Sequence, residues 1–216
     1  MTERMGSQEF ADQPGVADWG VVFGGDWACA HFRTGTFDVG VALVQAIGEL
    51  AAAADHHPDV DLRYGSVGVR LTTHDVDGLS RLDVDLAREI SVAARKLGAT
   101  ADRTAVQHVQ VAIDARVPAD VRPFWEAVLG YRAVGDQDLH DPHRRGPTFW
   151  FQQMDAPRPQ RNRIHIDVYV PRDQAETRLA AALAAGGRIV GDAHAPEWWT
   201  LADAEGNEVD LAAWGH

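Results

Sequence analysis

The chain has 216 residues, 45% of them hydrophobic, and a formal net charge of −12 at pH 7. This length allows one large domain or two of about 100 residues, each with a core. The acidic charge argues against nucleic-acid binding, which requires clustered lysine and arginine. The single cysteine, Cys29, excludes an intrachain disulfide. No stretch reaches the ~20 apolar residues of a membrane span, so we expect a cytoplasmic protein without membrane contact.

The first half of the chain alternates strands and amphipathic helices. Apolar residues recur at every second position in the strands and at every third or fourth position in the helices. The elements expected are a frayed start over residues 1–16 or a short helix around residues 8–11, a strand at 26–34, a helix at 35–55, a strand at 64–74 and a helix at 80–97. Ser80 and Asp83 have the spacing of a capping box at the start of the last helix, and Gly98 is suited to end it.

Three histidines lie around the second strand. His56 and His57 stand at the C-terminal end of the first helix, which we expect Pro58 to close. His74 lies at the far end of the strand, on its polar face. Such imidazoles can act as acids and bases near neutral pH, bind a metal or be ordinary surface residues. Metal binding is the weaker interpretation here, because adjacent side chains such as those of His56 and His57 diverge.

Residues 98–105 lack a core pattern and predict a linker. We therefore expect two domains, residues 1–101 and residues 102–216, each with its own core.

The second half of the chain contains a weak internal repeat. Strand, helix and further strands occur twice, and a histidine stands early in the first strand of each copy. These histidines are His108 and His165, with Asp114 and Asp167 further along the strands. The repeat predicts a domain of two paired modules with a cleft between them.

The run HHPDVDLRYGSVGVRLTTHDVDGLSRLDVDLA, with HFRTGTF upstream, resembles the pterin-4a-carbinolamine dehydratases over about residues 19–97. The signature of that family is a His-His-Pro, a strand with a tyrosine near its start, a Thr-His-Asp or Thr-His-Glu, then Gly-Leu and an aspartate on the next helix. The resemblance implies an α+β fold, with an antiparallel four-stranded sheet and helices on one face. It also implies a homo-oligomer, either a dimer or a tetramer.

The same resemblance implies a reaction and roles for five residues. The family removes water from a 4a-hydroxytetrahydropterin to give the quinonoid dihydropterin, without a metal or other cofactor, so the expected partner is a small-molecule pterin. His56 and His74 would be the acid-base pair, acting on the 4a-hydroxyl and a ring N–H. His57 would help to bind the pterin, and Asp75 and Asp83 would support the site. Asp83 is equally suited to a helix cap, and Asp75 to a turn.

The motifs FWEAVLGY, IHIDVYV and LADAEGNEVDLAAW resemble the glyoxalase/bleomycin-resistance/dioxygenase superfamily, also called vicinal oxygen chelate proteins, over about residues 105–214. The implied fold is a pair of βαβββ modules around a cleft. Metal-binding members carry ligands on four strands, and these positions are His108, Gln152, His165 and Asp210. Such a set could hold a divalent ion such as Zn, Fe, Mn or Ni. The alternative is a metal-free cleft in which the two histidines are polar lining.

Three functions are consistent with this organisation. The first is a two-domain enzyme, a pterin carbinolamine dehydratase fused to a glyoxalase-like domain. The second is a binding protein whose cleft captures a metabolite or antibiotic, with the N-terminal half providing oligomerisation. The third is a metal-dependent lyase or dioxygenase acting through the C-terminal cleft. The intact set of His56, His57 and His74 favours the first.

Overall fold

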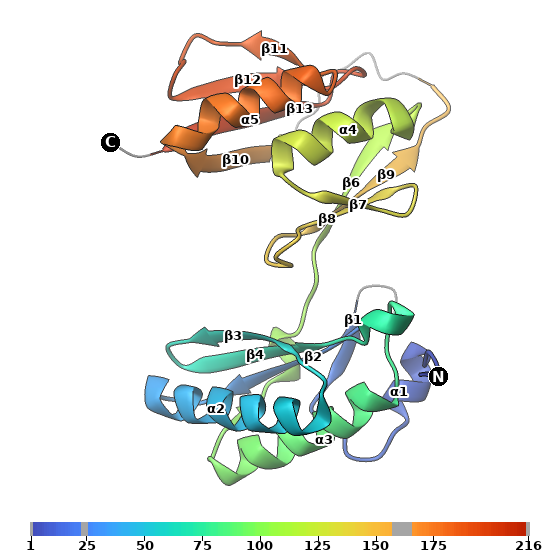
Figure 1. Cartoon of the computed structure of the whole chain (residues 1–216), viewed down its shortest axis with the longest axis vertical. Coiled ribbons are helices and arrows are strands. Elements are labelled where there is room, and N and C mark those ends of the chain that lie inside the picture. Colours follow the sequence, from blue (N-terminus) through green and yellow to red (C-terminus); the bar gives the residue numbers. More distant parts are fainter. Residues whose placement is uncertain (1, 23–25, 157–165, 215–216) are drawn as a thin grey trace. The chain divides into compact units, whose positions relative to one another are not determined.

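The computed structural model describes residues 2–22, 26–156 and 166–214. The chain divides into two compact units, residues 1–108 and 109–216, and each unit has its own cluster of buried apolar side chains. Both units combine helices with sheets, which confirms the predicted α+β class (Figure 1).

The first unit is an antiparallel sheet covered on one face by helices (Figure 1). Its strands are β1 (Gly20–Val22), β2 (Trp27–Arg33), β3 (Asp59–Arg63), β4 (Ser66–Leu71) and β5 (Thr100–Ala101). Its α-helices are α1 (Ser7–Ala11), α2 (Phe37–Ala54) and α3 (Arg81–Lys96). The strand order is β1-β2-β4-β3, and β5 pairs with β2. The sheet therefore has the four expected strands and a short fifth one.

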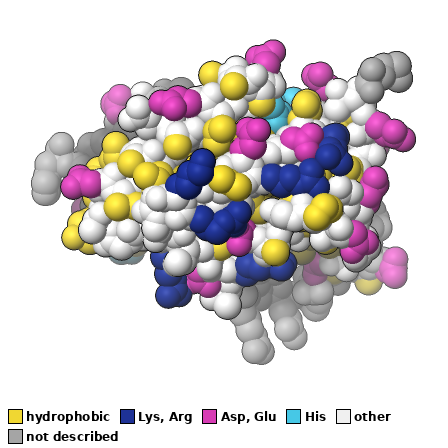
Figure 2. Space-filling view, turned by 90° about the horizontal axis from the view of Figure 1, so that it is seen from below, with side chains coloured by type: hydrophobic (Ala, Val, Ile, Leu, Met, Phe, Trp, Pro, Cys, Tyr) yellow, Lys and Arg dark blue, Asp and Glu magenta, His cyan; other side chains and the backbone are white. Residues whose placement is uncertain are grey.

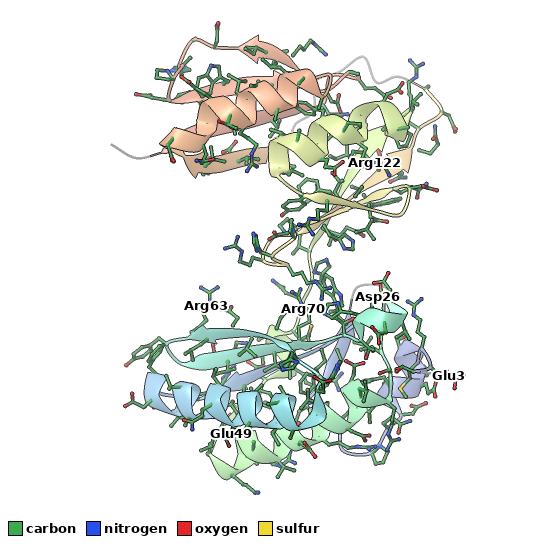
Figure 3. All side chains as sticks on the ribbon, in the orientation of Figure 1. Glu3, Asp26, Glu49, Arg63, Arg70 and Arg122 are labelled. Carbon is green, nitrogen blue, oxygen red and sulfur yellow. The ribbon has the colours of Figure 1, made fainter. Side chains whose placement is uncertain are left out.

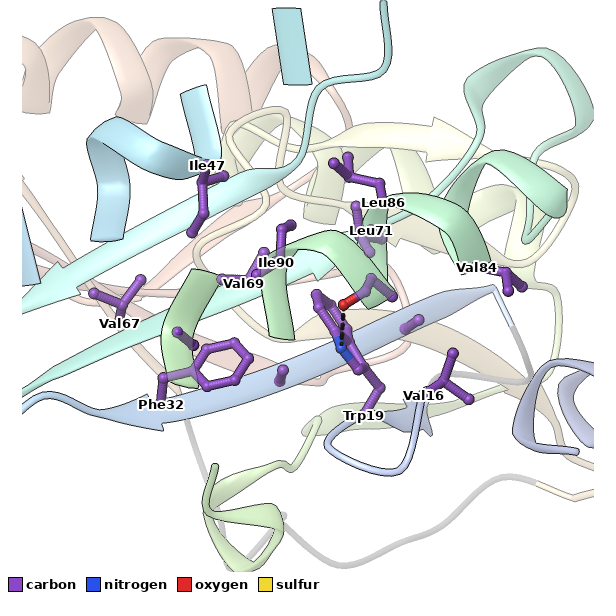
Figure 4. Close-up of a cluster of buried hydrophobic side chains, with 14 of the residues drawn as sticks. Val16, Trp19, Phe32, Ile47, Val67, Val69, Leu71, Val84, Leu86 and Ile90 are labelled. Carbon is purple, nitrogen blue, oxygen red and sulfur yellow. Dashed lines mark hydrogen bonds between the residues drawn. The ribbon is translucent and has the colours of Figure 1, made fainter. Parts of the chain in front are cut away.

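Alternation along the strands determines which side chains enter the core. Phe32 of β2 and Val69 of β4 face the helices and are buried with Trp19 and Ile90 (Figure 4). The indole N–H of Trp19 donates to Oγ of Ser91 at 3.0 Å, so the polar atom of this large side chain is satisfied inside the core. The strand residues that alternate with these core residues therefore lie on the opposite face of the sheet, which no helix of the described chain covers.

α2 ends before the histidines rather than at Pro58. Its last helical residue is Ala54, and Asp55 follows in the left-handed conformation with φ 49°. The backbone N–H of His56 then donates to the carbonyl oxygen of Ala51 at 3.1 Å. This arrangement is a common way to end a helix, and it turns the chain so that His56 points back into the unit.

α2 is also long and apolar enough to cross a membrane, and it is the one helix of the described chain that meets this test. Its mean hydropathy is 1.5 over 18 residues. We did not expect such an apolar helix from the sequence. Leu43 and Ile47 pack in the core of the first unit, yet only 22% of the helix is buried. Much of its apolar surface is therefore open within a single chain.

The segment that the sequence predicts as a linker is part of the first unit. Ala99 is buried, the next two residues form β5, and a 3₁₀ turn, η3 (Arg103–Ala105), follows. Asp102 donates its backbone N–H to the carbonyl oxygen of His31 at 2.8 Å and pairs with Arg33. The sequence did not reveal this structure in residues 98–105, because its contacts are made by polar groups and by short strand pairings. Such contacts leave no apolar periodicity in the sequence.

The second unit consists of two βαβββ modules, as the internal repeat predicts. The first module contains β6 (Gln110–Ala115), α4 (Pro118–Leu129), β7 (Arg132–Val134), β8 (Asp138–His140) and β9 (Thr148–Gln153). The second contains β10 (Ile166–Pro171), α5 (Arg172–Ala184), β11 (Arg188–Gly191), β12 (Trp198–Ala202) and β13 (Glu208–Trp214). The strand orders are β6-β9-β8-β7 and β10-β13-β12-β11, with the first and last strands of each module parallel.

Candidate active site

The centre of the candidate site is a buried pair formed by His56 and Asp83. Nε2 of His56 lies 2.8 Å from Oδ1 of Asp83, and the two residues are 8% and 0% exposed. His56 follows the end of α2, whereas Asp83 lies in the first turn of α3. The end of one helix and the start of the next thus bring together two groups that are far apart in the sequence.

The second oxygen of the same carboxylate caps α3. Oδ2 of Asp83 accepts the backbone N–H of Ser80 at 2.8 Å, which completes the predicted capping box. It also accepts the hydroxyl of Thr73 at 2.7 Å. The two roles that the sequence left open for Asp83 are therefore compatible, because each would use a different oxygen.

Two hydroxyl groups continue this network. Thr73 uses its one hydroxyl proton on Asp83, so in the 2.7 Å contact between Thr73 and Ser80 the hydroxyl of Ser80 is the donor. Oγ of Ser80 in turn accepts the backbone N–H of Leu82 at 3.2 Å. All of these donors are directed toward the carboxylate. The position of the Asp83 carboxylate is thus fixed by hydrogen bonds from its own unit.

The other predicted site residues are more exposed. His57 follows His56 directly and is exposed to solvent. His74 and Asp75 are exposed on a 3₁₀ turn, η2 (His74–Val76), that directly follows Thr73. The structure therefore provides one buried histidine held by a carboxylate, with one exposed histidine next to it in sequence and another next to Thr73.

The outer face of the sheet carries an ion pair beside an aromatic ring. Arg70 donates to Oδ2 of Asp59 from Nε at 3.1 Å and from Nη2 at 2.7 Å. Its guanidinium carbon lies 4.5 Å from the centre of the Trp27 ring (Figure 3). Cys29 lies in register with Arg70, and burial raises the pKa of its thiol to about 11, with Asp59 raising it and Arg70 lowering it. The thiol is protonated near neutral pH and is a poor nucleophile.

Sequence reasoning missed Thr73 and Ser80 as members of the site. The sequence marks Ser80 only as a helix cap. The signal for Thr73 is that it immediately precedes His74 in the Thr-His-Asp motif, and the structure shows it buried at 4% exposure.

The structure describes three of the four residues predicted as metal ligands. Gln152 on β9 lies in register with Asp114 of β6, and His108 precedes β6, which begins at Gln110. His108 belongs instead to the first unit, where its ring meets the Trp27 ring edge-on at 4.8 Å between centres.

The remaining members of that set are Asp210 and His165. Asp210 lies on β13 opposite Asp167, and His165 lies outside the described residues. Across the described part of the chain, no three His, Cys, Asp or Glu side chains are grouped so that they could hold a metal ion. The set that includes His165 stays a prediction.

Comparison with known proteins agrees with this division into units. A family model described as pterin 4 alpha carbinolamine dehydratase matches residues 2–93, and one described as glyoxalase-like domain matches residues 110–212. A protein of Nocardia farcinica assigned as a pterin-4-alpha-carbinolamine dehydratase is 39% identical over 80 residues, 37% of this chain and 82% of that protein. The chain belongs to the pterin-4a-carbinolamine dehydratase family. Its second unit is a glyoxalase-like domain, so both predicted resemblances are confirmed.

Solved structures are similar to each half. A transcriptional coactivator/pterin dehydratase from Brucella melitensis is 26% identical, with 43% of this chain and 99% of that chain covered and a TM-score of 0.40. A glyoxalase-related enzyme from Fulvimarina pelagi is 13% identical, with 50% of this chain and 88% of that chain covered and a TM-score of 0.40.

Proposed function

We propose that the first unit dehydrates a 4a-hydroxytetrahydropterin to the quinonoid dihydropterin, with His56, His57 and His74 as the catalytic residues. The reaction breaks a C–O bond, releases the hydroxyl as water and removes a proton from a ring nitrogen. It requires a proton donor and a proton acceptor, which two imidazoles can supply. Asp75 is proposed to support the binding of the pterin.

The observation that carries this proposal is the bond between His56 and Asp83. An ionised carboxylate can only accept hydrogen bonds, so Nε2 of His56 is its donor and carries the proton. In the neutral ring Nδ1 is then unprotonated, and no described residue forms a hydrogen bond to it. The buried carboxylate thus prepares His56 to accept a proton at Nδ1 and stabilises the imidazolium that results.

We propose a different role for each histidine. His56 takes the ring N–H proton, because its tautomer is fixed by Asp83. His74, exposed on its turn, delivers a proton to the departing hydroxyl. His57 is proposed to contact the bound pterin, since it is exposed directly beside His56.

The test is the rate at which the purified full chain dehydrates a 4a-hydroxytetrahydropterin. His56→Ala and His74→Ala should each lower that rate by about 10² or more, the usual contribution of an acid or base. His31→Ala is the matched control, because His31 lies on β2 in the same sheet but away from the Asp83 network. Wild-type turnover equal to that in buffer would overturn the proposal.

We further propose that the first unit self-associates through α2 and α3. A groove of about 580 Å³ runs between these helices. Its apolar lining residues are Ala42, Ala46, Leu50, Val92, Ala93 and Leu97. Figure 2 looks onto this side of the molecule and shows hydrophobic side chains exposed among charged ones.

The occupant we propose for the groove is a second copy of the chain. Glu49 and Glu89 border it together with Arg88 and Lys96, so the face carries both signs of charge. A two-fold axis would allow acidic side chains of one copy to meet basic side chains of the other. Val92, which lines the groove on α3, is 43% exposed, and such a contact would cover it.

A further inference from the structure

The loop that carries His74 is held differently at its two ends. It begins at Thr73, whose hydroxyl is bonded to Asp83 and Ser80 inside the unit. It ends at Gly78, whose carbonyl oxygen accepts the backbone N–H of Thr73 at 2.8 Å. The side chains between these two residues are exposed or half-buried. The backbone that carries His74 is therefore positioned by the two ends of the loop.

The N-terminal segment covers the Gly78 end. The backbone N–H of Met5 donates to the carbonyl oxygen of Leu79 at 2.6 Å, and the two residues form an antiparallel bridge. Both belong to the core, with exposures of 8% and 0%. Arg4 lies directly beside Gly78, since a Cβ added there would stand 2.5 Å from Nε of Arg4. This part of the polar start, which the sequence predicts as frayed or briefly helical, is in contact with the loop.

Asp26 holds the guanidinium of Arg4 in this position. Nη2 of Arg4 donates to Oδ1 of Asp26 at 2.5 Å, and Asp26 directly precedes β2 (Figure 3). The two side chains are 57% and 29% exposed. An ion pair this open to water adds little to global stability. Its effect is local, because it keeps a planar cation against the glycine that closes the His74 loop.

We propose that Arg4 and Met5 are positioning residues that hold the His74 loop in its working conformation, an inference that rests on the proposed dehydratase function. Gly78 is central to this arrangement. It is not among the residues with positive φ, so its backbone accepts alanine. The three atoms nearest to an added Cβ all belong to Arg4. Gly78→Ala should therefore displace Arg4 and leave the rest of the loop unobstructed.

The experiment compares four variants of the full chain: Arg4→Ala, Arg4→Lys, Gly78→Ala and the double variant Arg4→Ala/Gly78→Ala. Arg4→Ala and Gly78→Ala should each lower kcat about tenfold with KM nearly unchanged, because a small displacement of a catalytic group is costly. The double variant should be no worse than either single one, and Arg4→Lys should recover part of the loss. Arg63→Ala, which removes another exposed arginine of the same unit, should leave kcat unchanged.

Amide hydrogen exchange measures the same effect without relying on turnover. Exchange of residues 74–79 should quicken about tenfold in Arg4→Ala and in Met5→Pro, which removes the N–H that Leu79 accepts, while α3 keeps its protection. A wild-type chain without dehydratase activity would overturn the proposed function, and the exchange rates would still test the positioning. Unchanged exchange in both variants, or a double variant whose loss in kcat equals the product of the single losses, would overturn the positioning itself.

Discussion

Asp83 binds Nε2 of His56 with one carboxylate oxygen and caps α3 with the other. The start of α3 and the position of His56 are therefore fixed by one side chain that is fully buried. This arrangement links stability to chemistry, because any change that moves the start of α3 also moves His56. It also allows the two roles of Asp83, binding His56 and capping α3, to be tested separately, since each oxygen serves one of them.

Asp83→Asn should impair catalysis far more than folding. The amide oxygen can still accept the N–H of Ser80 and the hydroxyl of Thr73. The amide NH₂ then faces His56, whose Nε2 must become an acceptor, so the proton moves to Nδ1 and the proposed base is lost. We expect kcat to fall by about 10², with the urea midpoint close to that of the wild type.

The matched control is Asp85→Asn. Asp85 lies two residues later on α3, is half-exposed and pairs with Arg81 and Arg88. Its replacement should leave kcat unchanged, because surface pairs of this kind contribute ~0–1 kcal/mol to stability and none of them reaches the histidines. Equal losses in the two variants would show that Asp83 acts through the helix alone.

Features of the fold that depend only on neighbouring residues could be predicted from the sequence. Ser80, Asp83 and Gly98 marked the ends of α3 correctly, because capping depends on neighbouring residues. β3 was not predicted, although Val60 and Leu62 alternate with charged residues, because the strand is only five residues long and its side chains are largely exposed at the edge of the sheet. The bond between His56 and Asp83 joins residues 27 positions apart, so the sequence could name both but could not pair their atoms. The same limit applies to His108. The alternation of the residues around it suggested a strand, whereas its ring contacts Trp27, which is distant in the sequence.

His108→Ala should destabilise the first unit without altering metal binding. Its ring contacts Trp27, and aromatic contacts of this kind contribute about 1 kcal/mol. Equilibrium dialysis of the full chain against Zn²⁺, Mn²⁺ and Ni²⁺ should give the same result for variant and wild type, while the melting temperature falls by a few degrees. A tenfold loss of affinity for any of these ions would show that His108 is a metal ligand.

Cys29 should react slowly with alkylating agents in the native chain. Burial, and then Asp59, raise its pKa from 9.0 to about 11 against the opposing effect of Arg70. At pH 8 the thiolate fraction is then about 100-fold below that of the unfolded chain, and the iodoacetamide rate should follow it. The associated stability is present below pH 9 and is lost as the pH rises toward about 11. A native rate equal to the rate in urea would contradict this.

A fragment ending at residue 108 should be more stable than one ending at residue 101. The longer fragment keeps the backbone bond from Asp102 to His31, the bond from Arg103 to the carbonyl oxygen of Ala17, and the contact of His108 with Trp27. We expect both fragments to fold, with the longer one melting about 5 °C higher. Coincident melting curves would mean that residues 102–108 behave as the linker that the sequence predicts.

Ala46→Glu should convert the assembled protein into monomers. Ala46 lines the groove between α2 and α3, and a second copy seated there would bury the new carboxylate without a partner, which is costly. The expected result in analytical ultracentrifugation is a self-associating wild type and a monomeric variant with unchanged helix content. Tyr64→Glu is the control, because Tyr64 is 78% exposed in the turn between β3 and β4, away from both helices. If Ala46→Glu and the wild type sediment alike, the groove does not hold a second copy. If both Ala46→Glu and Tyr64→Glu dissociate the protein, the contact lies elsewhere on the unit, and the apolar surface of α2 remains open in the assembly.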